Sequence, residues 1–142
     1  MNDSRVLWLL IAAGRRIEER LEGALEPSGL SLAKLNALKY LVEAREPLAL
    51  GQLAEKIACV KSNVTQLVDR LENDGLVRRL ADPNDRRSVL AVVTDLGRQR
   101  YQAGSEALIS AESELLQDVP DAIRAEVSEL VSSLGGGVHQ AS

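Results

Sequence analysis

The stretch 61–94, KSNVTQLVDRLENDGLVRRLADPNDRRSVLAVVT, decides which fold the sequence predicts. Its first part has apolar residues at the i, i+3, i+4 and i+7 spacing of one helix face: Val64, Leu67, Val68 and Leu71. The opposite face carries hydrogen-bonding side chains of the types that pair with base edges and phosphates: Asn63, Gln66, Arg70 and Asn73, flanked by Ser62, Thr65 and Asp69. Asp74-Gly75 is predicted to end this helix, because glycine adopts the left-handed conformation that a helix end often needs.

After Gly75 the apolar pattern changes from helical to roughly alternating. Val77 leads into ADPNDRRS, and the β-branched run 89–93 follows. Two such runs on either side of an Asp-Pro-Asn-Asp turn predict a β-hairpin. Its loop carries Arg86 and Arg87 near the tip. Helix, hairpin and arginine-tipped loop together predict a winged helix.

In this order and spacing the segment resembles the MarR family of bacterial transcription regulators. The resemblance rests on the helix KSNVTQLVDRLENDGLV, on a D-x-R-S core in the wing (Asp85, Arg87, Ser88), and on Thr94-x-x-Gly97. It extends over about residues 5–134. It implies a mainly α fold: a winged helix-turn-helix with a small antiparallel β-sheet wing and long N- and C-terminal dimerisation helices.

Composition indicates a single domain over residues 1–142, since 142 residues with 45% hydrophobic content can bury one sizeable core. No run of about 18 apolar residues occurs, so no membrane span is expected. The apolar patch VLWLLIAAG is followed by Arg15 and Arg16 and by no signal-peptide cleavage pattern. The expected location is the cytoplasm.

The inventory of reactive side chains argues against an enzyme. The one cysteine, Cys59, excludes an internal disulfide, and the one histidine, His139, follows three glycines in an expected flexible tail, 135–142. No metal-spaced ligand set, Ser/His/Asp set with a rigid histidine, or glycine-rich phosphate loop is found in the sequence. No cofactor is expected.

The net charge of −4 looks unfavourable for DNA binding, but it is unevenly distributed. Residues 61–88 hold six basic and five acidic side chains, a balance of +1, which leaves −5 for the remainder. Binding depends on the local field more than on the total. A balance of +1 predicts weak non-specific affinity.

The chain begins with a predicted long helix, about residues 3–25, that is apolar on more than one side. One face carries Val6, Leu10, Ala13, Ile17, Leu21 and Leu25, and Leu7, Leu9 and Ile11 widen it. Such a helix needs more than one partner surface. It is either buried within its own domain or shared with a second subunit, and we favour the second because so small a chain has few surfaces to cover it.

The middle of the chain supplies the rest of the winged helix. Glu26-Pro27-Ser28-Gly29 breaks the first helix, and Ser31 is placed to cap a second one that ends near Pro47. Residues 48–50 are a candidate third strand, and 51–58 a short helix. The turn 58–60 then precedes the recognition helix, although Val60 is unable to cap it as Ser, Thr or Asp would.

Two further helices follow the wing. Thr94 is predicted to cap a long helix that begins at Asp95, and Pro120 to start the last helix. The last helix carries a clean apolar stripe: Ile123, Val127, Leu130, Val131 and Leu134. The expected organisation is therefore a winged-helix part at about 30–94 and dimerisation helices at about 3–26 and 95–134.

The family resemblance implies specific roles for the polar residues. A two-fold homodimer presents its recognition helices to adjacent major grooves about 34 Å apart, so a near-palindromic operator in double-stranded DNA is expected, and repression is the expected outcome. Base edges or nearby phosphates are assigned to Ser62, Asn63, Thr65 and Gln66, and a phosphate to Arg70. Arg86 and Arg87 should reach the minor groove or its phosphates. Arg87 has a second interpretation, an ion pair with Asp85 that stiffens the loop, whereas Arg78 and Arg79 are expected to be a solvated strand edge.

Alternatives remain open at this point. Cys59 is either a buried packing residue, which we favour, or a redox sensor. The chain is either a DNA-binding regulator or a winged-helix protein-interaction module that has lost DNA binding. Relatives often bind small aromatic acids or phenolics, and Trp8, Arg15, Arg16 and Tyr40 are candidates for such a site, although a core tryptophan and solvated arginines are the simpler interpretation.

Overall fold

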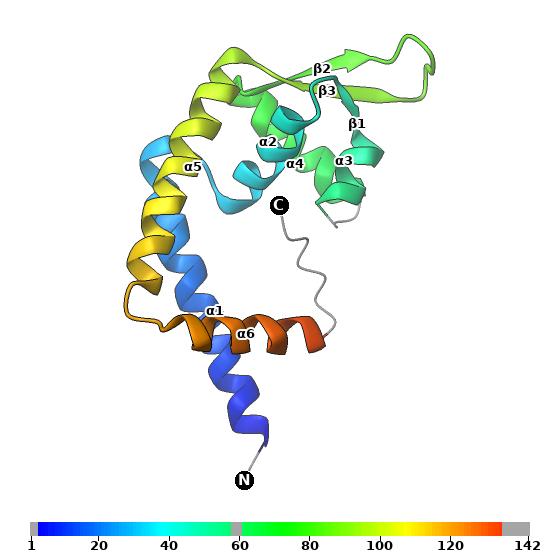
Figure 1. The fold of residues 1–142 in the computed structure, drawn as a ribbon. Coiled ribbons are helices and arrows are strands. Elements are labelled where there is room, and N and C mark those ends of the chain that lie inside the picture. Colours follow the sequence, from blue (N-terminus) through cyan, green and yellow to red (C-terminus); the bar gives the residue numbers. More distant parts are fainter. Residues whose placement is uncertain (1–2, 58–60, 135–142) are drawn as a thin grey trace. The chain divides into compact units, whose positions relative to one another are not determined.

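The computed structural model describes residues 3–57 and 61–134. In chain order its elements are α1 (Asp3–Leu25), the short 3-10 helix η1 (Glu26–Ser28), α2 (Leu32–Glu43), β1 (Leu48–Ala49), α3 (Leu50–Lys56), α4 (Lys61–Asn73), β2 (Val77–Ala81), β3 (Val89–Val93), α5 (Asp95–Leu116) and α6 (Asp121–Ser133) (Figure 1). The chain divides into two compact units, residues 1–111 and 112–142. The mainly helical winged fold confirms the predicted class.

The wing is a three-stranded antiparallel sheet in the order β1-β3-β2. β2 and β3 form the predicted hairpin, with register from Val77 opposite Val93 to Ala81 opposite Val89. β1 pairs with the other edge of β3, so the predicted third strand is confirmed, although Leu50 begins α3 instead of continuing the strand. Figure 1 shows the loop between β2 and β3 reaching out from the helices.

The core of this unit confirms the apolar face predicted for α4. Val64, Val68 and Leu71 are fully buried, and Leu67 is half-buried. The helix ends as predicted at Gly75, whose φ of 76° lies in the left-handed region. The Leu76 N–H donates to the Leu71 carbonyl and the Gly75 N–H to the Glu72 carbonyl, each at 2.9 Å. This Schellman motif satisfies the last carbonyls of α4 and turns the chain directly into β2.

Thr94 and Gly97 close the hairpin against the end of α4. The Thr94 hydroxyl accepts from the Gly97 N–H at 3.0 Å, which confirms the predicted cap, and donates to the Gly75 carbonyl at 2.7 Å. The Thr94 N–H donates to the Leu76 carbonyl at 3.0 Å. A Cβ on Gly97 would lie 2.1 Å from that same carbonyl oxygen. The Thr-x-x-Gly motif therefore reflects a close backbone approach that only glycine permits.

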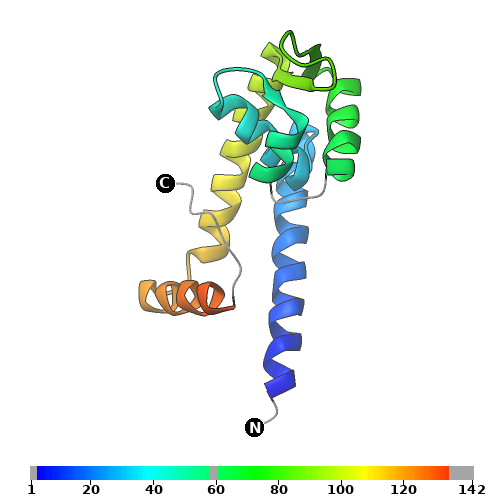
Figure 2. The same ribbon diagram turned by 90° about the vertical axis from the view of Figure 1, so that its right-hand side faces the viewer.

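The other predicted helix boundaries agree with the structure only in part, since α2 ends at Glu43, before the predicted end near Pro47, and α3 is Leu50–Lys56 where 51–58 was predicted. The Lys34 N–H donates to the Ser31 side chain at 3.2 Å, so Ser31 caps α2. α1 spans the predicted residues, and its N-terminal half extends beyond the rest of its unit (Figure 2). Its apolar residues 6–11 and Ile17 are exposed in the single chain, and so is the apolar stripe of α6. Residues 1–111 by themselves therefore leave this half of α1 uncovered.

Several predictions fall on residues outside the described part. These are the turn 58–60 with Cys59 and Val60, and the tail 135–142 with His139. They stay predictions. Among the described helices, none is both long enough and apolar enough to span a bilayer.

Candidate nucleic-acid interface

The outward face of α4 presents the polar residues predicted to contact DNA. Asn63, Thr65, Gln66 and Arg70 are all exposed, because the opposite face is held in the core by Val64, Val68 and Leu71. Ser62 also lies in α4, but its side chain is outside the described part of the chain. The structure thus exposes the predicted residues of α4 whose side chains it describes: Asn63, Gln66 and Arg70 line one hollow, and Thr65 lines another.

The loop of the wing is built from two consecutive turns. The Asp85 N–H donates to the Asp82 carbonyl at 3.4 Å, and the Ser88 N–H to the Asp85 carbonyl at 3.1 Å. Each aspartate carboxylate also accepts a backbone N–H two residues on, from Asn84 and from Arg87, both at 2.9 Å. Such Asx turns fix a loop locally. Arg86 and Arg87, the central residues of the second turn, are exposed.

This geometry refines the second interpretation of Arg87. Asp85 does stiffen the loop, but it does so by accepting the backbone N–H of Arg87. Within residues 3–57 and 61–134, no ion pair joins the Arg87 guanidinium to Asp85. The Arg87 guanidinium stays exposed at the wing.

Arg79 does not behave as the solvated strand edge that was predicted. Its guanidinium forms ion pairs with Asp69 and with Glu72, the latter at 3.2 Å, and donates to the Thr65 carbonyl at 3.2 Å. Its backbone N–H donates to the second Glu72 carboxylate oxygen at 2.9 Å. The prediction was wrong for Arg79 because the pleat of β2 turns this side chain toward α4, whereas Arg78 is exposed as expected.

The contacts of the acidic residues change the electrostatic picture of this surface. Asp69 and Glu72 pair with Arg79, and Asp74 pairs with Lys34 at 2.8 Å. The remaining two, Asp82 and Asp85, accept the backbone N–H groups of the wing turns. The exposed arginines of the segment are Arg70, Arg78, Arg86 and Arg87. Counting Lys34, which α2 contributes to this surface beside Asp74, raises the local balance from +1 to +2.

Two hollows connect these residues to neighbouring elements. One, of about 340 Å³, is lined by Asn63, Gln66 and Arg70 of α4 together with Asn36 of α2. The other, of about 330 Å³, is lined by Thr65 and Asp69 together with Arg79 and Arg87. Helix and wing thus face a common depression. Asn36 and Arg79 were missed by sequence reasoning, since nothing in the local pattern places them beside α4.

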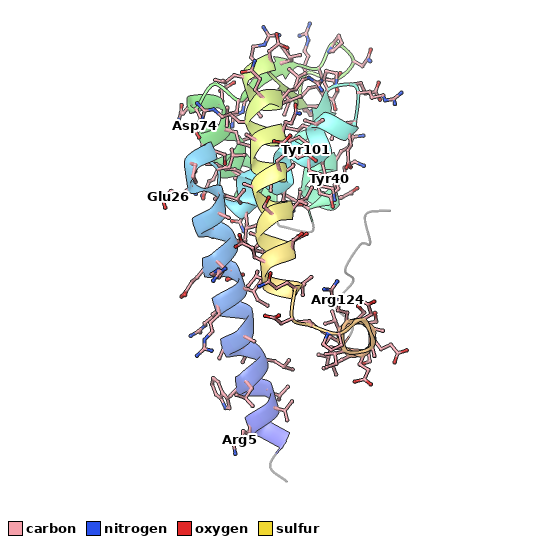
Figure 3. All side chains as sticks on the ribbon, turned by 60° about the vertical axis from the view of Figure 1, so that its left-hand side comes forward. Arg5, Glu26, Tyr40, Asp74, Tyr101 and Arg124 are labelled. Carbon is pink, nitrogen blue, oxygen red and sulfur yellow. The ribbon has the colours of Figure 1, made fainter. Side chains whose placement is uncertain are left out.

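A larger cleft of about 700 Å³ lies between α2 and α5. Its lining is mostly apolar, with a few polar groups: Leu32, Ala33, Leu35, Asn36 and Lys39 of α2, and Tyr101, Ser105, Leu108 and Ile109 of α5. None of the candidates Trp8, Arg15, Arg16 and Tyr40 lines it. Figure 3 shows Tyr101 on α5 and Tyr40 on α2, and Trp8 on α1 is 69% exposed. A cleft of this volume and apolar lining accommodates a small organic molecule.

Helices α3 and α4, followed by the β2–β3 hairpin, define a winged helix-turn-helix protein. The sequence model of the MarR family matches residues 30–89. The chain therefore carries the winged helix-turn-helix segment of a MarR-type transcriptional regulator.

Individual relatives agree with this assignment. The HTH-type transcriptional regulator YkoM of Bacillus subtilis is 40% identical over 63 residues, 44% of this chain and 41% of the relative. CouR from Rhodococcus jostii RHA1, solved bound to p-coumaroyl-CoA, is 26% identical with a TM-score of 0.76, over 93% of this chain and 92% of CouR. A mutant of MarR from E. coli complexed with operator DNA is 21% identical and shares the fold, with a TM-score of 0.81 over 92% of this chain and 93% of that one. The chain spans less than half the length of the curated relatives that it matches at 40% and 42% identity.

Proposed function

We propose that this chain is a dimeric, sequence-specific DNA-binding transcription regulator that represses from a near-palindromic operator and is released by a small ligand. In this organisation residues 30–94 bind DNA, and residues 3–26 and 95–134 form the dimer. One arrangement carries the proposal. Thr65 and Asp69 of α4 and Arg87 of the wing line one hollow, and Asn63, Gln66 and Arg70 of α4 line a second one. The acidic side chains near them are ion-paired or held in turns.

We assign different DNA contacts to α4 and to the wing because their exposed side chains differ in chemistry. Asn63 and Gln66 carry amide groups that can make paired hydrogen bonds to a base edge, which carry sequence information. Arg70 and the wing residues Arg86 and Arg87 offer charge to phosphates or to a narrow minor groove. Helix contacts therefore set specificity, and wing contacts set affinity and its dependence on salt.

The exposed apolar surface supports the dimer. Residues 6–11 of α1 and the stripe of α6 leave large side chains in solvent, with exposed fractions of 69% for Trp8 and 62% for Leu134. Contiguous apolar patches of this kind mark association surfaces. A second copy of the chain covers them in our proposal, and its two-fold symmetry matches a palindromic site.

The test of DNA binding begins with selection of bound duplexes from a random library by the purified chain, followed by affinity measurements on the selected operator and on random DNA. Asn63→Ala and Gln66→Ala should each cost about 1–3 kcal/mol on the operator and little on random DNA. Arg86→Ala should weaken both. It should also reduce the slope of log affinity against log salt by about 0.9 for each phosphate that residue 86 no longer reaches, and by about twice that in a dimer.

The proposal fails if selection recovers no preferred duplex, in which case the chain is a protein-interaction module. The assignment of roles fails if Arg86→Ala changes discrimination and leaves the salt slope unaltered. It fails equally if both α4 variants keep full discrimination, because base reading then lies outside this helix.

The ligand that we propose is a small aromatic acid or phenolic bound in the cleft between α2 and α5. The volume of about 700 Å³, the apolar lining and the Lys39 ammonium suit an aromatic body with a negative group. That CouR was solved with p-coumaroyl-CoA supports an aromatic acid or its thioester. Titration of 4-hydroxycinnamate and benzoate into the operator complex should release DNA. Leu108→Trp, which fills the cleft, should abolish that release, and unchanged release would exclude this cleft.

A further inference from the structure

We propose that Arg79 is a positioning residue that holds the recognition helix α4 and the wing at one fixed spacing, so that both engage DNA together. This inference rests on the proposed DNA-binding function. It assigns to Arg79 no contact with DNA. Its role is to act through Thr65 and Asp69 on one side and through the hairpin that carries Arg86 and Arg87 on the other.

The contacts of Arg79 span most of the length of α4. Thr65, Asp69 and Glu72 are spaced at i, i+4 and i+7, so they form one row along the edge of the helix that faces β2. The guanidinium reaches all three, through the Thr65 carbonyl at 3.2 Å and the two carboxylates. Because the Arg79 N–H also donates to Glu72 at 2.9 Å, side chain and strand backbone are tied to the same helix. A planar fork with several donors is needed for this, which lysine lacks.

The position of Arg79 within the hairpin explains why such a tie is needed. At the base of the hairpin, Val77 and Val93 are buried in the core. At the other end, next to the loop, Ala81 and Val89 are exposed. Arg79 lies between these ends, opposite Ala91. Pairing with β1 and the buried Ala91 hold the middle of β3. Arg79 ties the middle of β2 to α4, and without it the outer part of the wing would be freer to move relative to α4.

The same contacts also reduce the negative charge of the DNA-facing surface. Arg79 compensates one of the two negative charges of Asp69 and Glu72, and it lines the hollow of about 330 Å³ that Thr65 and Arg87 border from the helix and from the wing. Uncovered, the two carboxylates would repel a phosphate backbone at this place. A positioning role and a purely electrostatic role for Arg79 predict different DNA affinities when Arg79 is replaced and when Asp69 and Glu72 are replaced.

The experiment measures the affinity of the full-length chain for the selected operator and for random DNA over a range of salt concentrations. Arg78→Gln is the matched control, because Arg78 is the exposed neighbour on the same strand and its replacement removes the same formal charge. We expect Arg78→Gln to weaken both duplexes by a similar factor. Arg79→Gln should weaken operator binding about tenfold more than it weakens random binding, since only the operator complex requires helix and wing in register.

Coupling to the wing separates positioning from a general loss of stability. In a chain that already carries Arg86→Ala and Arg87→Ala, Arg79→Gln should cost little further operator affinity, because no wing arginine remains to be placed. A role in stability alone would give additive effects. Additive losses, or equal losses on both duplexes, would overturn the proposal.

If circular dichroism shows that Arg79→Gln misfolds, a second variant still tests the proposal. The double variant Asp69→Asn, Glu72→Gln keeps Arg79 and removes the two carboxylate charges that pair with it. We expect this variant to bind random DNA more tightly, because two negative charges are gone, and yet to discriminate the operator less. Full discrimination in this variant would refute the positioning role. Absence of any preferred duplex for the unmodified chain would instead refute the proposed function itself.

Discussion

Gly97→Ala should be among the most damaging single-methyl additions in this chain. The new Cβ would lie 2.1 Å from the Leu76 carbonyl oxygen and 2.7 Å from Val93 Cγ2. The valine methyl can rotate away, but the carbonyl is fixed because it accepts the Thr94 N–H at 3.0 Å. Since carbon–oxygen contacts are normally about 3.3 Å or longer, the start of α5 must move by about 1 Å.

The magnitude follows from what that movement disturbs. Overpacking of this kind costs about 1–3 kcal/mol. Weakening the bond between Thr94 and Leu76 and the Thr94 cap adds about 1–2 kcal/mol. The better helix propensity of alanine returns about 1 kcal/mol. The free energy of unfolding should therefore fall by about 1–4 kcal/mol.

Two other glycines supply the controls for this prediction. A Cβ on Gly51 meets nothing within 4 Å, so Gly51→Ala should be neutral or stabilising by about 0.5 kcal/mol. At Gly75 the nearest atom is Leu96 Cδ2 at 3.8 Å, and the cost of Gly75→Ala is that of its φ of +76°, about 1–2 kcal/mol. Urea denaturation, monitored by circular dichroism at one protein concentration, should give the highest midpoint for Gly51→Ala, a lower midpoint for Gly75→Ala and the lowest for Gly97→Ala. A midpoint for Gly97→Ala at or above that of Gly51→Ala would refute the close-approach argument.

Three further outcomes are expected. Thr94→Ala removes the hydroxyl that joins Gly75 and Gly97 and should lower the free energy of unfolding by about 1–2 kcal/mol in the same assay, whereas Thr94→Ser should restore most of it. Deleting residues 1–20, which stops short of the buried Leu25, should leave aggregated chain in sedimentation, and a folded soluble monomer would contradict an obligate dimer. Cys59→Ala should leave DNA release unchanged in response to the same signals, and a peroxide-dependent release that disappears in this variant would establish a redox sensor.

The parts of the structure that sequence reasoning captured are those encoded within a few residues. The buried face of α4 follows from spacing alone, and the caps Ser31 and Thr94 each bind a backbone N–H three residues on. The turn at Gly75 and the wing loop are equally local, since their hydrogen bonds close within six residues. Such features depend on residues close together in the sequence, so they can be predicted without knowledge of the tertiary contacts.

The contacts of Arg79 and the α2–α5 cleft could not be predicted from local sequence patterns. Arg78 and Arg79 are neighbours of identical type, and an edge strand places one on each face. Which face meets α4 depends on how the hairpin docks, so only the structure separates the exposed arginine from the paired one. Likewise, Lys39 and Tyr101 border one cleft although they lie 62 positions apart in the sequence. Sequence periodicity within α2 or α5 cannot reveal that pairing.

The acidic net charge and a DNA-binding role are compatible because of where the carboxylates lie. Asp69 and Glu72 are held by Arg79 within contact distance, and such short-range pairs are screened by salt far less than the attraction between exposed arginines and phosphates. Raising salt therefore removes the attraction of Arg70, Arg86 and Arg87 for the backbone while the geometry of α4 and the wing persists. Under the proposed roles, operator discrimination should survive at salt concentrations where random DNA is no longer bound, since we assign discrimination to the amide groups of Asn63 and Gln66 and to the spacing that Arg79 maintains.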